Sequence, residues 1–220
     1  MIKESFPGLY KYYKQQKLFR RVNKVLVRNS ESFLYTTGWL RSLAEGKPLD
    51  ETGNHIPWMN YPIVNLLRER LQSSFLLFEF GSGYSTLFYS RYVKKVISVE
   101  SDKYWYECVK NTLPGNAEIV FVNNDVDGDY CRASSRSGDR WDVIVVDGRD
   151  RVNCIKRSIS TLSERGVVLL DDSQRSRYQE GIIFARSRGF RDLSIESFKA
   201  TGITIDRTTI LYRQDNCMGI

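Results

Sequence analysis

The chain has 220 residues, of which 41% are hydrophobic and 27% charged, which suits one soluble globular domain with a sizeable core and a short extension. Four cysteines without a Cys-x-x-Cys pair and a single histidine argue against a zinc site, and free thiols in a reducing cytosol are expected, so we expect a cytoplasmic protein. The first residues lack the apolar run of a signal peptide, and no stretch is long and apolar enough to predict a membrane-spanning helix.

The net charge of +7 is concentrated at the start of the chain. Eight of the 33 basic residues and one of the 26 acidic residues fall in residues 1–28, which leaves 25 of each kind for the remainder. The excess of basic over acidic residues therefore lies in the first helix and not in the main domain. A charge-neutral main domain disfavours nucleic acid as a partner, because nucleic-acid binding normally needs a basic surface.

Residues 9–28 are expected to form a basic amphipathic helix. Leu18, Val22, Val25 and Leu26 are spaced at i, i+4, i+7 and i+8 and form one apolar stripe, with Lys and Arg at most other positions. The helix could pack on the domain with a solvated basic face. Alternatively, it could contact an anionic membrane surface or a partner protein, which would make the protein membrane-peripheral. Nucleic-acid binding is a third alternative.

Between this helix and the first strand the sequence predicts two more helices and a loop. Residues 33–44 are expected to form one helix, and residues 61–71 another. The intervening loop, residues 46–60, is too apolar to be only a linker. We therefore divide the chain into an N-terminal helical extension together with this loop, residues 1–59, and a main domain, residues 60–220.

A strand followed by a glycine turn organises the main domain. The apolar run 75–78 predicts a strand buried on both faces, with Glu79 at its end. Gly81 and Gly83 permit a sharp turn and a close approach of backbone to ligand, and Ser85 can cap the next helix. A strand, a glycine turn and a helix N-terminus together indicate a nucleotide-type site, although the third glycine of the dinucleotide fingerprint is missing.

The next three predicted strands also end in, or lead into, acidic residues. The strand 94–100 ends at Glu100, 21 residues after Glu79, where a nucleotide-binding α/β fold places the carboxylate that binds ribose hydroxyls. The two strands after it lie at 117–122, before Asn124 and Asp125, and at 141–146, before Asp147 and Gly148.

In this order and spacing, these segments resemble the class I S-adenosylmethionine-dependent methyltransferases over roughly residues 60–213. The resemblance implies an α/β, Rossmann-like fold: a seven-stranded, mostly parallel sheet with an antiparallel last strand and helices on both faces, here with an N-terminal helical extension. Alternation of strands and helices to the end of the chain calls for the same architecture. The remaining helices are expected at 85–92, 103–113, 151–163 and 177–188, and the remaining strands at 166–170, 190–198 and 208–212.

The resemblance also implies a binding site for S-adenosylmethionine. In this family Glu79 would lie near the amino-acid end of the cofactor, Glu100 would accept from the ribose hydroxyls, and Asp125 would face the adenine amino group. The implied cofactor-binding residues are Glu79, Gly81, Gly83, Ser85, Glu100, Asp125, Val126 and Asp147.

Three carboxylates are expected to converge at the ends of the fourth and fifth strands. Asp147 closes the fourth strand, and Asp171 and Asp172 close the fifth. Like charges at one sheet edge are costly unless a cation or a proton relieves them. The arrangement resembles the metal-dependent catechol-type O-methyltransferases, which implies Mg²⁺ held by these three residues, although the lysine base of those enzymes is absent. Without a metal, Asp147, Asp172 or His55 would take the proton of the acceptor hydroxyl.

Other residues are expected near the acceptor. In the family resembled, the segment before the first strand often covers the methionine end of the cofactor, so His55 and Trp58 are candidate pocket residues. Arginines follow the same strand ends as the aspartates, and they could bind an acidic acceptor such as a sugar acid or pair with the local aspartates. These are Arg149, Arg151, Arg175 and Arg177.

The function expected from this resemblance is O-methylation of a small-molecule or glycan hydroxyl. The residues after the fourth strand lack the tetrapeptide of amino-methylating DNA enzymes and the Pro-Cys of cytosine-C5 enzymes. Aminopropyl transfer is an alternative, because Asp147 and Asp150 match the Asp-x-x-Asp of polyamine synthases. A non-catalytic module that binds a cofactor or a partner through the basic helix is another.

Overall fold

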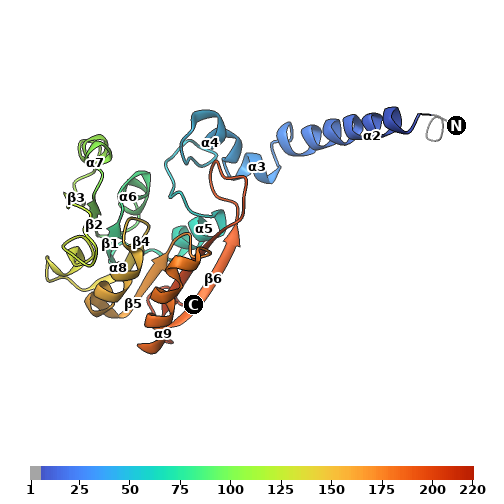
Figure 1. The fold of residues 1–220 in the computed structure, drawn as a ribbon. Coiled ribbons are helices and arrows are strands. Elements are labelled where there is room, and N and C mark those ends of the chain that lie inside the picture. Colours follow the sequence, from blue (N-terminus) through green and yellow to red (C-terminus); the bar gives the residue numbers. More distant parts are fainter. Residues whose placement is uncertain (1–5) are drawn as a thin grey trace.

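The computed structural model describes residues 6–220, which form an α/β domain and a helical N-terminal segment (Figure 1). The expectation about a signal peptide rests partly on residues 1–5, which lie outside the described residues. Within residues 6–220, none of the helices combines the length and the apolar character needed to cross a membrane.

Seven strands form one sheet in the order β3-β2-β1-β4-β5-β7-β6. Strands β1 to β5 pair in parallel, and β7 is antiparallel to both of its neighbours, β5 and β6. This confirms the predicted fold class, a seven-stranded, mostly parallel sheet. The strands are β1 (Leu76–Phe80), β2 (Lys95–Glu100), β3 (Ala117–Phe121), β4 (Trp141–Val146), β5 (Leu162–Leu170), β6 (Arg191–Ser197) and β7 (Asp206–Tyr212).

Helices cover both faces of this sheet, and the central strands show why. Val143 and Val145 of β4 pack with residues of α5 and α6 on one face, whereas Ile144 and Val146 pack with residues of α8 and α9 on the other. Alternate residues of a strand point to opposite faces, so a continuous apolar run fits a strand covered on both sides. The helices of the domain are α5 (Tyr61–Arg70), α6 (Tyr84–Tyr89), α7 (Lys103–Lys110), α8 (Arg151–Ser158) and α9 (Gln179–Ser187), with single 3₁₀ turns η2 (Ala133–Ser135), η3 (Ile159–Thr161) and η4 (Ser176–Tyr178).

The N-terminal helix stands away from the sheet (Figure 1). Helix α2 (Pro7–Val22) continues into a π-helical turn, η1 (Asn23–Val27), and neither contains a buried residue. The predicted basic helix is therefore present, but the interpretation that it packs on the domain is wrong for the described residues.

The expected single helix over residues 33–44 is also wrong. The chain forms two short helices, α3 (Phe33–Thr36) and α4 (Trp39–Glu45), separated at Gly38. Gly38 has a φ of +78°, and a Cβ there would lie 2.3 Å from the carbonyl carbon of Asp50. The break is thus fixed by a tertiary contact with the loop 46–60, where Asp50 also pairs with Arg68 at 2.9 Å.

Candidate functional site

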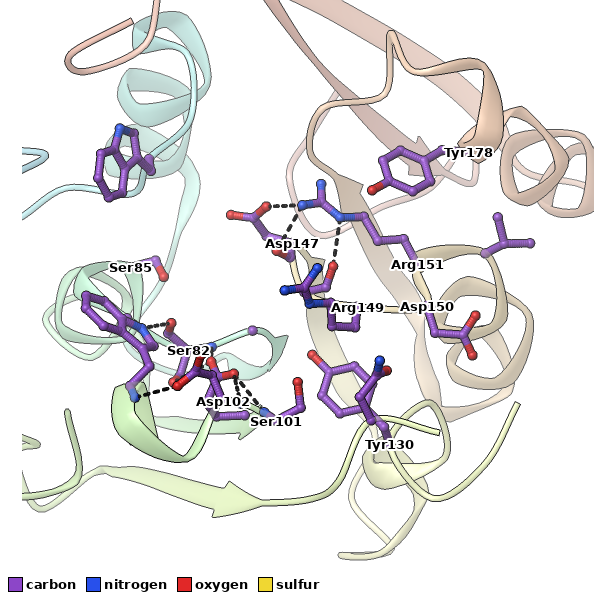
Figure 2. A pocket seen from close by; sticks show the side chains of 18 of the residues that line it. Ser82, Ser85, Ser101, Asp102, Tyr130, Asp147, Arg149, Asp150, Arg151 and Tyr178 are labelled. Atoms are coloured by element: carbon purple, nitrogen blue, oxygen red, sulfur yellow. Dashed lines mark hydrogen bonds and ion pairs between the residues drawn. The ribbon is translucent and has the colours of Figure 1, made fainter. Parts of the chain in front are cut away.

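A cavity of about 990 Å³ lies at the carboxyl ends of the central strands (Figure 2). Its volume is at the upper end of the range usual for small-molecule sites. In open α/β sheets, ligands bind outside the carboxyl ends of the strands, at the point where the strand order reverses and a crevice opens between the loops. The wall is formed mainly by residues 81–85, residues 100–102 with Trp105, residues 147–152, and the group Arg175, Arg177 and Tyr178.

The floor of the cavity is made of main chain. Gly81 has a φ of +93°, and a Cβ at this position would lie 2.8 Å from the Cα of Gly148. A Cβ on Gly148 would lie 2.0 Å from the Tyr130 hydroxyl. Only glycine therefore fits at either position, and the backbone after β1 packs directly on the backbone after β4.

Glu79 lies beneath this floor and not in the cavity wall. The strand β1 continues one residue past Glu79 to Phe80, which corrects the expected strand end, and the Glu79 side chain is fully buried. Its carboxylate accepts from the Thr86 and Ser98 hydroxyls, each at 2.6 Å, and from Ser85. Burial raises the pKa of Glu79 to about 7 despite these donors. Ser85 lines the cavity, so Glu79 acts on the site by orienting Ser85.

Glu100 lines the cavity at the end of β2, and its carboxylate already accepts four hydrogen bonds. One oxygen accepts from the backbone N–H of Ser82 at 3.0 Å and from the Ser82 hydroxyl at 3.1 Å. The other accepts from the backbone N–H groups of Ser101 and Asp102, at 2.7 and 2.8 Å. Glu100 thus ties the glycine turn to the start of α7.

Asp125 and Val126 lie outside the cavity wall, whereas their neighbour Asn124 is part of it. The Asp125 carboxylate accepts from the backbone N–H groups of Asp129 and Tyr130, at 3.0 and 3.3 Å, and so closes a turn of its own loop. Val126 is 86% exposed. Of the three residues 124–126, Asn124 is therefore the one that borders the cavity.

Two aromatic residues complete the half of the cavity next to the glycine turn. The Trp105 indole packs against Gly83 and donates from Nε1 to the Ser82 carbonyl at 2.6 Å. Tyr130 is fully buried, and its hydroxyl has no hydrogen-bond partner in the described part of the chain. A buried polar group without a partner costs stability unless a ligand satisfies it. A glycine floor, a planar indole and an unpaired hydroxyl fit a nucleoside-bearing ligand such as S-adenosylmethionine.

The three carboxylates converge as predicted. Oxygens of Asp147, Asp171 and Asp172 lie within 4.8 Å of one another. Asp147 faces the cavity with 28% of its side chain exposed, whereas Asp171 and Asp172 are buried. The Asp171 carboxylate accepts from the Thr208 hydroxyl at 2.6 Å.

Cationic side chains already neutralise this cluster. Arg151 lies 2.8 Å from Asp147 and 3.5 Å from Asp172, and Asp172 also pairs with Arg175 at 2.8 Å and Lys199 at 3.1 Å. Because three cations occupy positions around the carboxylates, the residues present do not fit Mg²⁺, which needs free oxygen ligands in an octahedral arrangement. Burial and the charges of Asp147 and Asp172 also raise the pKa of Asp171 to about 8, which favours its protonated form near neutral pH. The pKa of Asp147 is also raised, chiefly by burial, although the Arg151 charge opposes the shift.

The two candidate pocket residues of the loop 46–60 differ in whether they line the cavity. Trp58 is part of the cavity wall, and its Nε1 donates to the Ala200 carbonyl at 2.8 Å. His55 is not in the wall; it stacks on Tyr84, a wall residue, with ring centroids 4.2 Å apart. Burial and the nearby charges of Lys47 and Arg91 lower the pKa of His55, which favours its neutral imidazole.

Sequence reasoning missed Lys199, and it singled out Asp150 for a different role. Lys199 lies after β6 and reaches Asp172 because β7 inserts between β5 and β6; the sequence around it carries no motif. Asp150 lines the cavity, but its carboxylate accepts from the backbone N–H of Asp127 at 2.8 Å and from the Asn153 amide. Asp150 therefore holds the loop after β3, which does not favour the aminopropyl-transfer alternative.

Comparison with solved structures identifies the fold. An rRNA methylase from Streptococcus thermophilus aligns with a TM-score of 0.53 and 14% identity over 69% of this chain and 96% of that one. The O-methyltransferase TomG from Streptomyces achromogenes, in complex with S-adenosylmethionine, aligns with a TM-score of 0.55 and 17% identity over 67% and 77%. A precorrin-6y C5,15-methyltransferase from Geobacter metallireducens aligns with a TM-score of 0.50 and 13% identity over 69% and 87%.

No family model and no curated protein sequence matches this chain. The identities to the solved structures are low, so what these structures share with this chain is the fold. The chain therefore has the fold of the class I S-adenosylmethionine-dependent methyltransferases.

Proposed function

We propose that this protein is an S-adenosylmethionine-dependent methyltransferase that methylates a hydroxyl group of a small molecule or glycan. One observation carries the proposal. The main-chain floor of Gly81 and Gly148 and the partly exposed carboxylate of Asp147 face the same cavity, so a cofactor and an acceptor can meet beside a base. The methyltransferase fold of the chain supports the same reaction.

Residues on one half of the cavity would hold the cofactor. Gly81, Gly83 and Ser85 provide a close backbone approach and a hydroxyl, while Trp105 and Asn124 border the space for a nucleoside. When bound, S-adenosylmethionine supplies a methyl group on a positively charged sulfur that leaves as a neutral thioether. Most of the acceleration of such a transfer comes from positioning, which demands that the wall be rigid.

Asp147 is the residue best placed to accept the acceptor's proton. The Asp147 carboxylate would take the proton of the acceptor hydroxyl as that oxygen receives the methyl group that a bound S-adenosylmethionine would supply. Arg151 fixes that carboxylate through its 2.8 Å contact. Because the pKa of Asp147 is raised, the acidic limb of the rate profile should lie above the ordinary range of an aspartate.

The proposal is tested by calorimetric titration with S-adenosylmethionine, followed by a methyl-release assay over a panel of hydroxyl acceptors. We expect Asp147→Asn to bind the cofactor as the wild type does and to lose about 10²- to 10⁴-fold in kcat, the usual contribution of a general base. Asp129→Asn, an exposed acid paired with Arg136, is the matched control and should keep full activity. Absence of cofactor binding by the wild type would overturn the proposal.

A further inference from the structure

The part of the cavity wall formed by the segments after β4 and β5 is rich in arginine. Four arginines line it there: Arg149, Arg151, Arg175 and Arg177. Two of them are held by the protein. Arg151 is buried and donates to the carbonyls of Asp147, Gly148 and Asp171, and Arg175 pairs with Asp172 at 2.8 Å.

The other two arginines have no carboxylate partner. Arg149 and Arg177 are exposed, and within residues 6–220 neither lies within ion-pair distance of an acidic side chain. The Arg177 guanidinium lies 4.9 Å from the ring centre of Tyr178, whose ring also contacts Arg151 at 5.1 Å. Stacking on that ring holds Arg177 at the edge of the cavity. Figure 2 shows Arg149 and Asp147 in the same cavity.

Their chemistry points to an anionic ligand. A guanidinium donates two parallel hydrogen bonds to a carboxylate or a phosphate, and a pair of free guanidinium groups favours that kind of group over a neutral one. Asp150, an acid that could compete, is engaged by Asp127 and Asn153. The anion would therefore bind to the part of the wall that follows β4 and β5, which also carries the proposed base.

We propose that the methyl acceptor carries a carboxylate or phosphate group that Arg149 and Arg177 bind while the acceptor's hydroxyl faces Asp147. This inference rests on the proposed methyltransferase function. The alternative expectation, that the arginines only pair with local aspartates, holds for Arg151 and Arg175.

The first test measures anion binding without turnover. The full chain is titrated with inorganic phosphate and, separately, with acetate, at constant ionic strength set by NaCl, and the melting temperature is recorded. We expect either anion to raise the melting temperature of the wild type and the double variant Arg149→Gln/Arg177→Gln to need at least tenfold more of it. Arg188→Gln is the control, because Arg188 is an exposed arginine that contacts an aromatic ring at 5.2 Å outside the cavity. The anion that gives the larger shift in melting temperature, phosphate or acetate, indicates whether the acceptor carries a phosphate or a carboxylate.

The second test separates this inference from the proposed function. S-adenosylmethionine binding is measured in the same double variant, and unchanged affinity is expected. For an anionic acceptor that is turned over, the variant should raise KM tenfold or more with a small change in kcat. No response to either anion by the wild type, or an unchanged response in the double variant, overturns the inference. Loss of cofactor binding in the double variant also overturns it, since the arginines would then bind the cofactor's carboxylate. If the wild type binds phosphate but not S-adenosylmethionine, the anion site is supported and only the methyltransferase proposal is contradicted.

A separate observation concerns helix α2. At about 100° per residue, its second half places apolar and basic side chains on different sides of the helix. The apolar side consists of Leu18, Phe19 and Val22, and the basic side of Lys14, Lys17, Arg20 and Arg21. Leu18 and Phe19 are 62% and 66% exposed although α2 is well formed. A folded domain normally buries such side chains, so the helix lacks its partner.

We infer that α2 binds the surface of an anionic lipid bilayer. A short amphipathic helix with a Lys- and Arg-rich face and an apolar face lies in the plane of the membrane interface. Tyrosines Tyr10, Tyr12 and Tyr13 in the first half suit the headgroup region, where aromatic side chains with a polar tip concentrate. A nucleic acid would leave the apolar side uncovered, and a second protein helix would leave the basic side unpaired.

The test is flotation of the full chain with phosphatidylcholine vesicles, with and without phosphatidylserine, at low and high salt. We expect binding only to the anionic vesicles, and loss of it at high salt. Each cation near an anionic surface contributes about fivefold, so the triple variant Lys17→Gln/Arg20→Gln/Arg21→Gln should bind roughly 100-fold more weakly. The control variant Lys94→Gln/Lys103→Gln/Arg188→Gln removes three exposed cations elsewhere and should bind as the wild type does. No binding to anionic vesicles overturns the inference, as does self-association that Phe19→Ser abolishes, because the apolar side would then contact a second copy.

Discussion

The carboxylate of Glu100 uses all four of its acceptor positions within the protein. Ribose hydroxyls could bind it only by displacing a present donor, such as the Ser82 hydroxyl at 3.1 Å. The implied role of Glu100 as a ribose ligand therefore comes with a second role, since the same carboxylate fixes the backbone of Ser82 and Asp102, both in the cavity wall.

Replacement of Glu100 by Gln should weaken S-adenosylmethionine binding by about 10- to 100-fold, because hydrogen bonds to a charged group contribute about 1.5–3 kcal/mol. The amide would also place an N–H₂ group against a backbone N–H, so the melting temperature should fall. Glu107→Gln is the matched control, because Glu107 is an exposed residue of α7 that does not line the cavity. Calorimetry measures both affinities, and equal affinities in the two variants would contradict this role.

At the scale of elements, the turn after β1 is constrained from two directions. Gly81 needs a left-handed φ, and its backbone contacts Gly148 after β4. Gly81→Ala should lower the free energy of unfolding by about 1–3 kcal/mol, the usual cost of such strain, and abolish cofactor binding. Gly115→Ala serves as the control, since a Cβ there meets nothing within 4 Å. Denaturant unfolding and calorimetry give the two quantities, and a Gly81→Ala protein as stable as the control would show that the turn relaxes.

The helices and strands could be predicted where the local sequence determines them. The prediction was wrong where a distant contact determines the structure. The apolar runs located the strands, and their acidic ends located the convergence of Asp147 and Asp171, because parallel strands deliver their carboxyl ends to one edge. The break at Gly38 depends on Asp50, which packs against it from the following loop. Lys199 reaches the carboxylates through the insertion of β7, which no local pattern near it indicates.

At the scale of the whole molecule, two buried acids, Glu79 and Asp171, make the stability of the fold depend on pH. The pKa of Glu79 is raised to about 7 and that of Asp171 to about 8, in both cases first by burial, while both return to ordinary values in the unfolded chain. The folded protein therefore keeps protons that the unfolded chain has lost. These two groups favour the fold fully below their unfolded pKa values, and that contribution is lost as the pH rises from about 4 to about 8.

The free energy of unfolding should accordingly decline between about pH 5 and pH 8, and Asp171→Asn should decline less steeply because the uncharged amide keeps the contact with Thr208 without titrating. Asp129→Asn makes the same chemical change at an exposed site and should follow the wild type. Urea unfolding at a series of pH values measures the slopes. Parallel curves for Asp171→Asn and the wild type would show that this proton is not held in the folded state.

The main-chain floor of the cavity has a consequence for how its specificity can change. Gly81 and Gly148 present no side chain to exchange, so mutation cannot enlarge or recharge that surface without breaking it. Elsewhere the wall carries two exposed arginines without a carboxylate partner in the described residues, Arg149 after β4 and Arg177 after β5, and their side chains can be exchanged without disturbing the packing of the fold. Laboratory evolution toward a new acceptor should therefore accumulate substitutions at Arg149 and Arg177. The residues proposed to hold the cofactor should remain unchanged. The preference for an acceptor would then change while the methyl donor stays the same.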